Sequence, residues 1–294
     1  MTEMNLIIDK EKCVKCGLCI KDCSAKSIEF GEDGFPVVAQ NGEKRCFKCQ
    51  HCLSICPTGA LSIFGKNPEN SNSIENSINP DDLLSLIQSR RSVRHYKHEN
   101  IAPEKMEKLK NMLKYVPTGC NNHGLHFSVI DDVEVMDKFR EKINKRVINV
   151  ISNNTVKLVT KKFGHYIDAM KNGEDILFRT APHMVVVSVE KNAPCKDIDP
   201  TIALSYFELY AQSMEIGTCW CGLVYWLLTM MPELQGLLEI PETHKIGYVM
   251  LFGNPENKYT RTPQPKDVPI VSVKKEGKEL NLTFIQKVKR IFGK

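Results

Sequence analysis

The chain has 294 residues, a formal net charge of +5 and a hydrophobic fraction of 42%. This length predicts one large domain or two of unequal size, with enough apolar residues for a packed core. No stretch reaches the apolar length that a bilayer span needs. The segment MTEMNLIIDKEKC has no secretory h-region, and twelve cysteines in a reducing compartment favour metal or redox roles over disulfides. We therefore expect a cytoplasmic protein.

Eight of the twelve cysteines form an internal repeat near the start of the chain. Both copies have the spacing C-x2-C-x2-C-x3-C and are offset by 33 residues: Cys13, Cys16, Cys19 and Cys23, then Cys46, Cys49, Cys52 and Cys56. Short β-like runs follow each copy at 27–30 and 60–64, and a turn at 31–34 precedes another run at 35–38. The pattern predicts a small module of two similar halves over residues 1–65.

Three cysteines at this spacing can wrap one face of a [4Fe–4S] cubane, while the fourth thiolate reaches the other cluster. We expect one cluster on Cys13, Cys16, Cys19 and Cys56, and the other on Cys46, Cys49, Cys52 and Cys23. Two oxidised clusters with their thiolates would lower the charge from +5 to about +1, so nucleic-acid binding has little support. The alternatives, zinc sites and a disulfide framework, lack the paired C-x2-C motifs and the secretory signal that they need.

The repeat resembles bacterial two-cluster ferredoxins over residues 5–65. Those proteins usually have proline after the fourth cysteine; Cys56-Pro57 keeps this feature, whereas Cys23 is followed by Ser24. Two polar residues inside the second loop, Lys48 and His51, are expected to be exposed to solvent.

Residues 66–79, KNPENSNSIENSIN, predict a solvated linker. Asn79-Pro80-Asp81 then predicts a helix start. Apolar residues mark one face of that helix (Leu83, Leu84, Ile87) and of the next (Met106, Leu109, Leu113, Val116). Strands are expected at 126–130, 184–189 and 247–252, and a long helix from Asp199-Pro200 to a stop at Gly217. This mixture predicts an α+β domain over 80–270. In the C-terminal extension, 271–294, the basic amphipathic segment 284–294 suits a surface helix or membrane contact.

A basic run, Arg90-Arg91-Ser92-Val93-Arg94, closes the first of these helices. Its three guanidiniums and one hydroxyl can neutralise and hydrogen-bond a phosphate ester, although a solvated helix end is the alternative. Three further segments follow in order: 117–123, 217–222 and 253–266. Together the four segments resemble the flavin-dependent nitroreductase family over residues 80–268. The resemblance implies FMN, with its phosphate on Arg90, Arg91, Ser92 and Arg94.

The resemblance also implies which residues of the later segments bind FMN. In the family, a loop like 117–123 meets the flavin across a dimer interface, which implicates Pro117, Thr118 and Asn121. This chain has His123 and Gly124-Leu125 where the family has an amide and a Pro-Trp pair, and a helix end stopped by Gly119 is the alternative. A loop like 217–222 follows the flavin near its N5 atom, which implicates Thr218, Cys219, Trp220, Cys221 and Gly222. Late basic residues, Arg261 and Lys266, either close over the phosphate or are ordinary surface cations.

Four cysteines lie outside the repeat. Cys219 and Cys221 form C-x-C, not the C-x-x-C exchange motif, so we expect buried structural thiols there and, by the same reasoning, at Cys120 and Cys195. His165 and Tyr166 lie where the family often has a mobile lid; exposure or packing is the alternative role.

Clusters carry single electrons, whereas flavin can pair them, and fusion of the two modules raises their effective concentration. We therefore expect a homodimeric FMN-dependent reductase fed through two [4Fe–4S] clusters by a low-potential donor (ferredoxin, flavodoxin or NAD(P)H). The expected acceptors are nitroaromatic, quinone or related conjugated compounds. No Ser-His-Asp or paired-carboxylate arrangement is visible, so no catalytic side chain is expected. The alternatives are a specialised flavin reductase such as a reductive dehalogenase, and a non-catalytic electron carrier or redox sensor.

Overall fold

The computed structural model of the protein describes residues 4–74, 78–152, 169–170 and 172–273. The chain divides into a unit Met1–Arg261 and a second unit from Thr262 onward, in which the described residues form no helix or strand. Two segments singled out above, His165 with Tyr166 and the tail 284–294, lie outside the described residues. No helix in the described ranges is long and apolar enough to cross a membrane.

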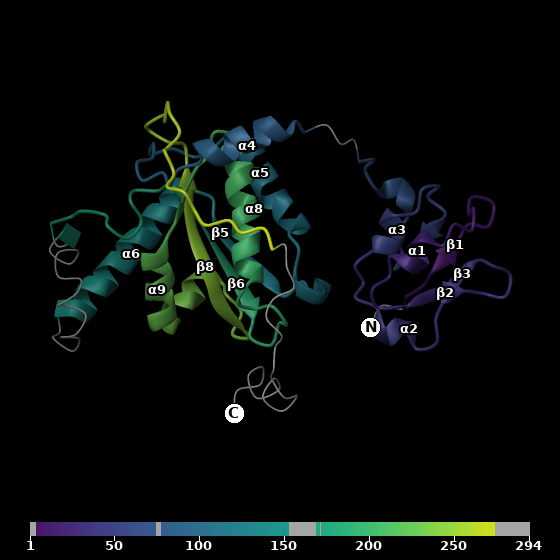
Figure 1. Ribbon diagram of the computed structural model, residues 1–294. Helices are drawn as coiled ribbons and strands as arrows, with labels where there is room; N and C mark the ends of the chain where they lie inside the picture. Colours follow the sequence, from purple (N-terminus) through teal and green to yellow (C-terminus); the bar gives the residue numbers. More distant parts are fainter. Residues whose placement is uncertain (1–3, 75–77, 153–168, 171, 274–294) are drawn as a thin grey trace, which may run out of the picture. The chain divides into compact units, whose positions relative to one another are not determined.

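The cysteine-rich region consists of two small antiparallel sheets and three short helices (Figure 1). One sheet pairs β1 (Ile7–Ile8) with β4 (Leu61–Ser62), and the other pairs β2 (Ile28–Phe30) with β3 (Pro36–Val38). The helices are α1 (Leu18–Lys21), α2 (Gly42–Arg45) and α3 (His51–Ser54). The two halves are joined through β1 and β4, which come from opposite ends of the module.

The cysteine repeat is also a repeat of backbone conformation. Helices α1 and α3 begin 33 residues apart, and so do strands β2 and β4. Positive φ angles recur at the same offset, in the pairs Lys15 and Lys48, Gly17 and Gln50, and Lys26 and Gly59. Left-handed residues tighten a loop so that successive backbone N–H groups point toward one centre. The two cysteine runs therefore fold as two copies of one loop.

The segment expected as a linker begins with ordered structure. Residues Pro68–Asn70 form a 3-10 turn, whose N-cap Asn67 accepts a hydrogen bond from the Glu69 N–H at 3.2 Å. The Glu69 carboxylate also lies 3.2 Å from Lys12 Nζ. Contacts with the cysteine-rich region thus continue beyond residue 65, while residues 75–77 are outside the described part.

The second half of the first unit contains a four-stranded antiparallel sheet of order β5-β6-β8-β7. Its strands are β5 (Leu125–Ile130), β6 (His183–Glu190), β7 (Gly217–Trp220) and β8 (His244–Gly253). The three strands expected from the sequence are confirmed, and β7 is a fourth. The helices are α4 (Pro80–Ser89), α5 (Pro103–Met112), α6 (Val133–Ser152), α8 (Asp199–Ser213) and α9 (Gly222–Met230).

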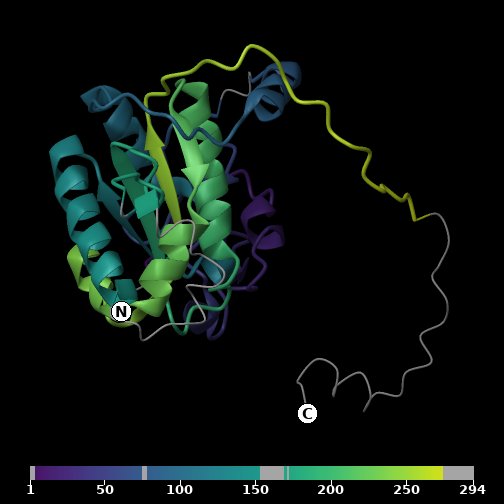
Figure 2. The same cartoon turned by 90° about the vertical axis from the view of Figure 1, so that its left-hand side faces the viewer.

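Helices cover both faces of this sheet, as the two views in Figures 1 and 2 agree. The side chains of β6 alternate between the two layers. Met184 and Val186 pack in one cluster with residues of α6 and α9, whereas Val185 and Val187 pack in the other with residues of α5 and α8. A strand buried on both faces reads as a continuous apolar run, which explains the sequence MVVVSV. The α+β class expected for this region is confirmed.

The helix ends differ from expectation at two places. Helix α4 begins as predicted, with the Asn79 side chain accepting from the Asp81 N–H at 3.0 Å, but it buries none of its residues. Its three apolar side chains are 43–50% exposed: Leu83, Leu84 and Ile87. Helix α8 ends at Ser213 rather than at Gly217, because the chain turns through Glu215 in the left-handed region (φ 62°). Gly217 instead begins β7, so its predicted role as a helix stop is wrong.

His183, the first residue of β6, is fully buried against the Phe252 ring. Its Nε2 accepts a hydrogen bond from the Ile101 N–H at 3.1 Å, so the imidazole is neutral in this site. Burial lowers the pKa of His183 from 6.5 to about 4. A histidine with a lowered pKa stabilises the fold while it is neutral. That contribution is complete above pH 6.5 and is lost as the pH falls toward 4.

We predict that the free energy of unfolding of this part falls by about 2 kcal/mol between pH 7 and pH 5 because of His183. Both tryptophans, Trp220 and Trp226, lie in this part, so their fluorescence in urea titrations follows its unfolding. The matched variant is His183→Gln, which keeps an acceptor for Ile101 and cannot titrate in this range. Equal pH dependence in the two proteins would contradict the prediction.

Candidate functional site

Two cavities in the cysteine-rich region are each lined by four cysteines. One is lined by Cys13, Cys16, Cys19 and Cys56, and the other by Cys23, Cys46, Cys49 and Cys52. The structure thus brings together the two sets that the spacing predicts, with the fourth cysteine exchanged between the halves. In the described residues, no three ligands converge as a single metal ion requires. A zinc ion draws its thiolates to about 2.3 Å, whereas a cubane keeps them apart on separate irons. The arrangement suits a cluster better than zinc.

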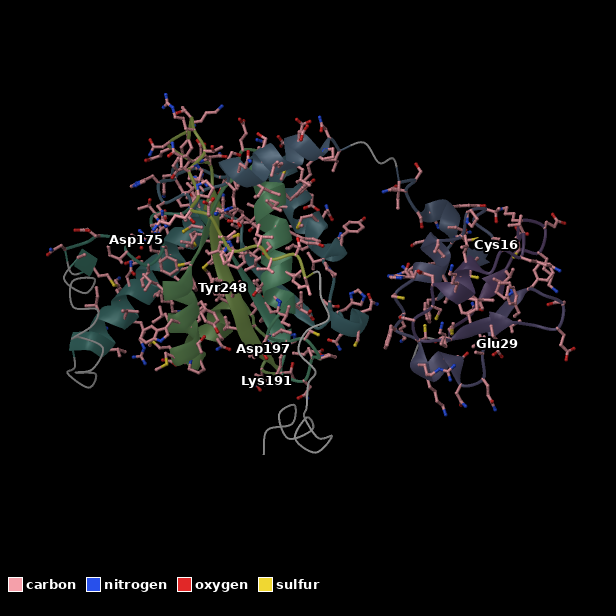
Figure 3. All side chains as sticks on the ribbon, viewed as in Figure 1. Cys16, Glu29, Asp175, Lys191, Asp197 and Tyr248 are labelled. Atoms are coloured by element: carbon pink, nitrogen blue, oxygen red, sulfur yellow. The ribbon has the colours of Figure 1, made fainter. Side chains whose placement is uncertain are left out.

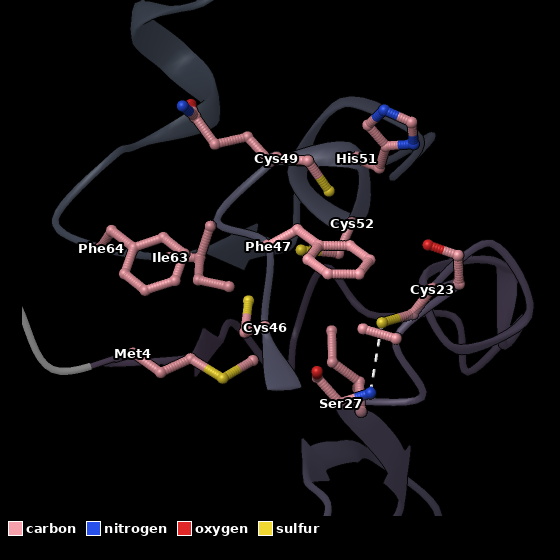
Figure 4. A pocket seen from close by; sticks show the side chains of 14 residues that line it. Met4, Cys23, Ser27, Cys46, Phe47, Cys49, His51, Cys52, Ile63 and Phe64 are labelled. Atoms are coloured by element: carbon pink, nitrogen blue, oxygen red, sulfur yellow. Dashed lines mark hydrogen bonds between the residues drawn. The ribbon is translucent and has the colours of Figure 1, made fainter. Parts of the chain in front are cut away.

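The second cavity, shown in Figure 4, combines thiols with an apolar lining. Met4, Phe47, Ile63 and Phe64 surround the four cysteines. Such a lining limits solvent access, which helps to set the potential of a bound cluster. Lys48 and His51 are exposed, as expected, and His51 Nδ1 lies 3.3 Å from an Asp22 carboxylate oxygen.

Backbone N–H groups are directed at the fourth cysteine of each set. The Ser27 N–H donates to Cys23 Sγ at 3.3 Å, and the Ala60 N–H donates to Cys56 Sγ at 3.2 Å. These bonds occupy equivalent positions in the two halves. The missing proline after Cys23 therefore leaves this hydrogen bond unchanged. Because N–H···S bonds stabilise thiolate charge, the donor set fits a [4Fe–4S] cluster at both cavities.

Burial also shapes the chemistry of the cluster thiols. It raises the pKa of Cys52 to about 12 and raises the pKa values of Cys19 and Cys46. Metal binding at these thiols must displace their protons, so cluster assembly is coupled to proton release.

In the second part of the unit, the basic segment 90–94 is fastened to β7. The Val93 N–H donates to the Thr218 carbonyl at 2.8 Å, and Ser92 forms a parallel bridge with Thr218. Gly217 permits this approach: a Cβ on it would lie 2.6 Å from a methyl carbon of Val93. The first and third predicted segments are therefore neighbours. Residues 217–220 form a strand and Gly222 opens α9, so the loop expected over 217–222 is corrected to a strand–helix junction.

A buried carboxylate that the sequence analysis missed lies between these two segments. Glu208, on α8, is 7% exposed and accepts from Arg90 at 3.3 Å and from the Thr218 hydroxyl at 3.3 Å. Its charge is offset by that of Arg90, which orients both segments. The available signal was a lone acid between the core residues Phe207 and Ala211 of an apolar helix.

The three guanidiniums of the basic segment have different environments. Arg90 pairs with Glu208, whereas Arg91 donates to the carbonyls of Arg90 and Gln88 and so caps the end of α4. Arg94 is exposed, and in the described part it makes only a long hydrogen bond, 3.5 Å to the Ser92 carbonyl. Arg94 therefore keeps donors free for an anion.

The segment that follows β8 reaches the same place. The Lys97 N–H donates to the Asn254 carbonyl at 2.9 Å, and Tyr96 forms a bridge with Pro255. The Tyr96 hydroxyl donates to the Val93 carbonyl at 2.8 Å, and burial raises its pKa. Three of the four predicted segments thus meet around Val93 and Tyr96. Arg261 and Lys266 are both exposed, and Lys266 belongs to the second unit.

The remaining segment, 117–123, is anchored elsewhere. The Gly119 N–H donates to both carboxylate oxygens of the buried Asp199 at 3.1 Å, and the His123 N–H donates to the Thr118 hydroxyl at 3.0 Å. The alternative in which Gly119 stops a helix is wrong, since α5 ends at Met112 and a 3-10 turn carries the chain to Tyr115. Three residues here have positive φ: Cys120, Asn121 and His123. Pro117 is exposed, whereas Thr118 and Asn121 are half-buried.

The four other cysteines have different environments. Cys219 and Cys221 are each 6% exposed, as expected, and the Cys221 thiol donates to the Leu177 carbonyl at 3.3 Å. Burial raises the pKa of both thiols, that of Cys221 to about 11, so they are neutral and weakly nucleophilic. Cys120 is exposed and Cys195 half-buried, so the expectation of buried thiols there is corrected. Cys120 lies in the left-handed region (φ 55°) of the surface loop, which turns it away from the core.

Trp220 lies on the other face of β7. Its ring is edge-on to Tyr248 with centroids 5.2 Å apart, and Tyr248 stacks on Tyr225 at 4.9 Å. Tyr248 is labelled in Figure 3. Trp220 and the two buried thiols of β7 therefore serve opposite layers, as strand alternation requires.

Comparison with protein-family models gives two matches. Residues 87–254 match the nitroreductase family, and residues 12–60 match the 4Fe-4S dicluster domain.

Individual proteins resemble separate parts of the chain. A protein of Archaeoglobus fulgidus, provisionally named an NADH dehydrogenase/NAD(P)H nitroreductase, is 26% identical over 179 residues, which is 60% of this chain and 88% of that protein. An archaeal-type glutamate synthase (NADPH) of Dehalococcoides mccartyi is 34% identical over 64 residues, 21% of this chain; the chain spans only 12% of its length. A crystal structure of a nitroreductase with bound FMN from Bacteroides fragilis covers 65% of this chain and 99% of its own, with 22% identity and a TM-score of 0.52. This structural likeness concerns the fold alone.

The contact between Gly217 and Val93 predicts the effect of a single methyl group. Gly217→Ala must displace Val93 and the basic segment, at a cost of about 1–3 kcal/mol in unfolding free energy. The matched control is Gly236→Ala, since a Cβ on Gly236 meets no atom within 4 Å. Urea unfolding followed by tryptophan fluorescence compares the two variants, and equal stabilities would contradict this account of the junction.

The exchange of cysteines between the cavities predicts the iron content of double variants. Cys19→Ala with Cys56→Ala removes two ligands of one cluster and leaves about four irons per chain. Cys19→Ala with Cys23→Ala removes one ligand from each cluster and lowers the iron content further, toward zero. Iron and acid-labile sulfide are measured on anaerobically purified protein. The opposite ranking would mean that each run of four binds its own cluster.

Proposed function

Because the chain belongs to the nitroreductase family and carries a 4Fe-4S dicluster domain ahead of the family domain, we propose that it is an FMN-dependent reductase fed with electrons through two [4Fe–4S] clusters. One observation carries the proposal: the same chain holds two four-cysteine cavities and a basic segment fastened to β7 through Val93 and Thr218. The first suits clusters and the second suits a phosphate-bearing cofactor. The relative from B. fragilis binds FMN, which supports the choice of flavin.

The side chains proposed to hold FMN divide by role. Ser92 and Arg94 are the best-placed donors for its phosphate, because Arg90 is engaged with Glu208 and Arg91 with the end of α4. Arg90 and Arg91 then act by shaping the segment. The other proposed FMN-binding residues are Pro117, Thr118, Asn121, Thr218, Cys219, Trp220, Cys221, Gly222, Arg261 and Lys266.

Bound clusters supply electrons singly, and bound FMN supplies the capacity to deliver them as a pair. The chain's own residues bind and orient these groups. Glu208 holds the Arg90 guanidinium and the Thr218 hydroxyl in one arrangement, and the buried β7 thiols exclude water from that side of the strand. No protein side chain is assigned as a catalytic acid or base, so the acceptor's protons come from solvent or from groups outside this cluster of residues.

The proposed partners follow from the same family assignment. We propose a homodimer, supported by the loop at 117–121, which is anchored through Asp199 but leaves Pro117 and Cys120 exposed. The electron donor is a ferredoxin, a flavodoxin or NAD(P)H; the name of the A. fulgidus relative favours the nicotinamide. The acceptors are nitroaromatic, quinone or related conjugated compounds. Twelve cysteines, eight of them in the cluster repeat, favour a cytoplasmic location. The proposed domain bounds remain 1–65, 80–270 and 271–294, with a linker at 66–79.

The first experiment measures iron, sulfide and flavin in anaerobically purified protein. The proposal expects about eight irons and one FMN per chain. Anaerobic turnover is then measured with a reduced ferredoxin or NADPH against nitroaromatic and quinone acceptors. Full cofactor content without turnover would point to an electron carrier or sensor, and protein without flavin would end the proposal.

A cluster-deficient variant separates the two modules. Cys56→Ala is expected to lose most turnover driven by reduced ferredoxin, because one cluster is missing from the route to the flavin. The same variant should keep its FMN and reduce the acceptor normally when the flavin is photoreduced directly. The matched control is Cys195→Ala, a half-buried cysteine outside the cluster repeat. Undiminished ferredoxin-driven turnover in Cys56→Ala would show that the clusters do not feed the flavin.

A further inference from the structure

The segment 175–182, just before β6, packs against all three family segments that meet around Val93. At one end, the Leu177 carbonyl accepts from the Cys221 thiol at 3.3 Å. At the other end, Pro182 and Tyr96 both pack against Gly253, where a Cβ would lie 2.5 Å from Pro182 and 3.1 Å from Tyr96. Nothing in the sequence marks this segment, yet its contacts place it at the edge of the proposed FMN site.

Two adjacent residues of this segment have an unfavourable backbone conformation. Arg179 has φ 51° and Thr180 has φ 56°, although neither is glycine. L-residues rarely adopt the left-handed region, and such conformations concentrate at functional sites. The surrounding structure must therefore hold this turn in place.

A buried ion pair supplies that support. Asp175 (labelled in Figure 3) accepts from the Phe178 N–H at 2.9 Å and from the Thr180 N–H at 2.8 Å. Arg140, from α6, lies 2.8 Å from the Asp175 carboxylate and donates to the Ala181 carbonyl at 2.7 Å. The side chains of Asp175 and Arg140 are only 9% and 14% exposed. Residues on both sides of Arg179 are thus fixed by hydrogen bonds, which orients its side chain.

The Arg179 guanidinium shares its surroundings with Arg94. Both arginines oppose the effect of burial on the pKa values of Cys219 and Tyr96, so both lie near these groups. In the described part of the chain, neither arginine forms an ion pair with a carboxylate. The acid nearest to them, Glu208, is already engaged by Arg90 and the Thr218 hydroxyl. Two half-buried or exposed guanidiniums without a counter-charge make an anion site.

We propose that Arg179 and Arg94 together bind an oxyanion, the phosphate monoester of the flavin. This inference rests on the proposed function and adds to it a residue from outside the four family segments. Guanidinium forks match the geometry of a phosphate, and a pair of them from separate segments can contact it from two sides. The Asp175–Arg140 pair acts indirectly, by keeping the strained turn that presents Arg179.

The experiment compares FMN with riboflavin, which has the same ring system but no phosphate. Affinities of the flavin-free full-length chain are measured by quenching of flavin fluorescence. Arg179→Met is expected to weaken FMN binding about tenfold or more and to leave riboflavin binding within about twofold of the unchanged protein. Arg94→Met provides the benchmark for a phosphate contact. The control is Arg146→Met, an exposed arginine on α6 that pairs with Glu233.

A second variant guards against a merely structural effect. Arg179→Gly removes the charge but suits the positive φ, so it should retain or raise the unfolding free energy while still weakening FMN binding. A raised ionic strength should reduce the difference between the unchanged protein and both variants, since the lost interaction is electrostatic.

The outcomes separate the possible sources of the anion. Equal losses for FMN and riboflavin would mean that Arg179 only shapes the turn, which overturns the proposal. Unchanged flavin binding with a raised KM for 4-nitrobenzoate, but not for 4-nitrobenzamide, would also overturn it and assign the pair to an acceptor carboxylate. Failure of the unchanged protein to bind FMN would refute the proposed function itself, independently of Arg179.

Discussion

The proposed flavin site depends on one backbone hydrogen bond, from the Val93 N–H to the Thr218 carbonyl. This bond joins a basic segment at the end of α4 to a strand more than a hundred residues later in the chain. Gly217 lets the two backbones approach, and Glu208 ties the side chains of Arg90 and Thr218 together beneath them. Without this junction, the guanidiniums of the segment would be an ordinary solvated helix end, which is the alternative that the sequence leaves open.

The cysteine-rich region follows a simpler principle. Ligands and scaffold come from one loop used twice, with the same helix, strand and left-handed positions 33 residues apart. Pairing of β1 with β4 brings the two copies face to face, so that Cys23 and Cys56 each line the cavity of the other run. Its local geometry follows from spacing, because the separation of the cysteines leaves a short loop few ways to wrap a cubane.

Charge is arranged differently in the second part, where buried acids position cations instead of reacting. Asp199 holds the loop at Gly119, Asp175 holds the turn at Arg179, and Glu208 holds Arg90. Each of these carboxylates is nearly or fully buried, and each would destabilise the fold if it lost its donors. The fold thus spends its buried acids on geometry and leaves Arg94 and Arg179 without a carboxylate partner among the described residues.

The sequence by itself determined the cysteine sets, the apolar strand β6, the start of α4 at Asn79 and the order of the family segments. These features are local: a ligand spacing, an unbroken apolar run or a capping residue acts on its immediate neighbours. The sequence could not place the end of α8, the exposure of Cys120, or the roles of Glu208 and Arg179. Only the tertiary structure decided these, because the meaning of an isolated acid or arginine depends on which groups face it across the fold. Such neighbours come from distant segments, and no periodicity within the chain records them.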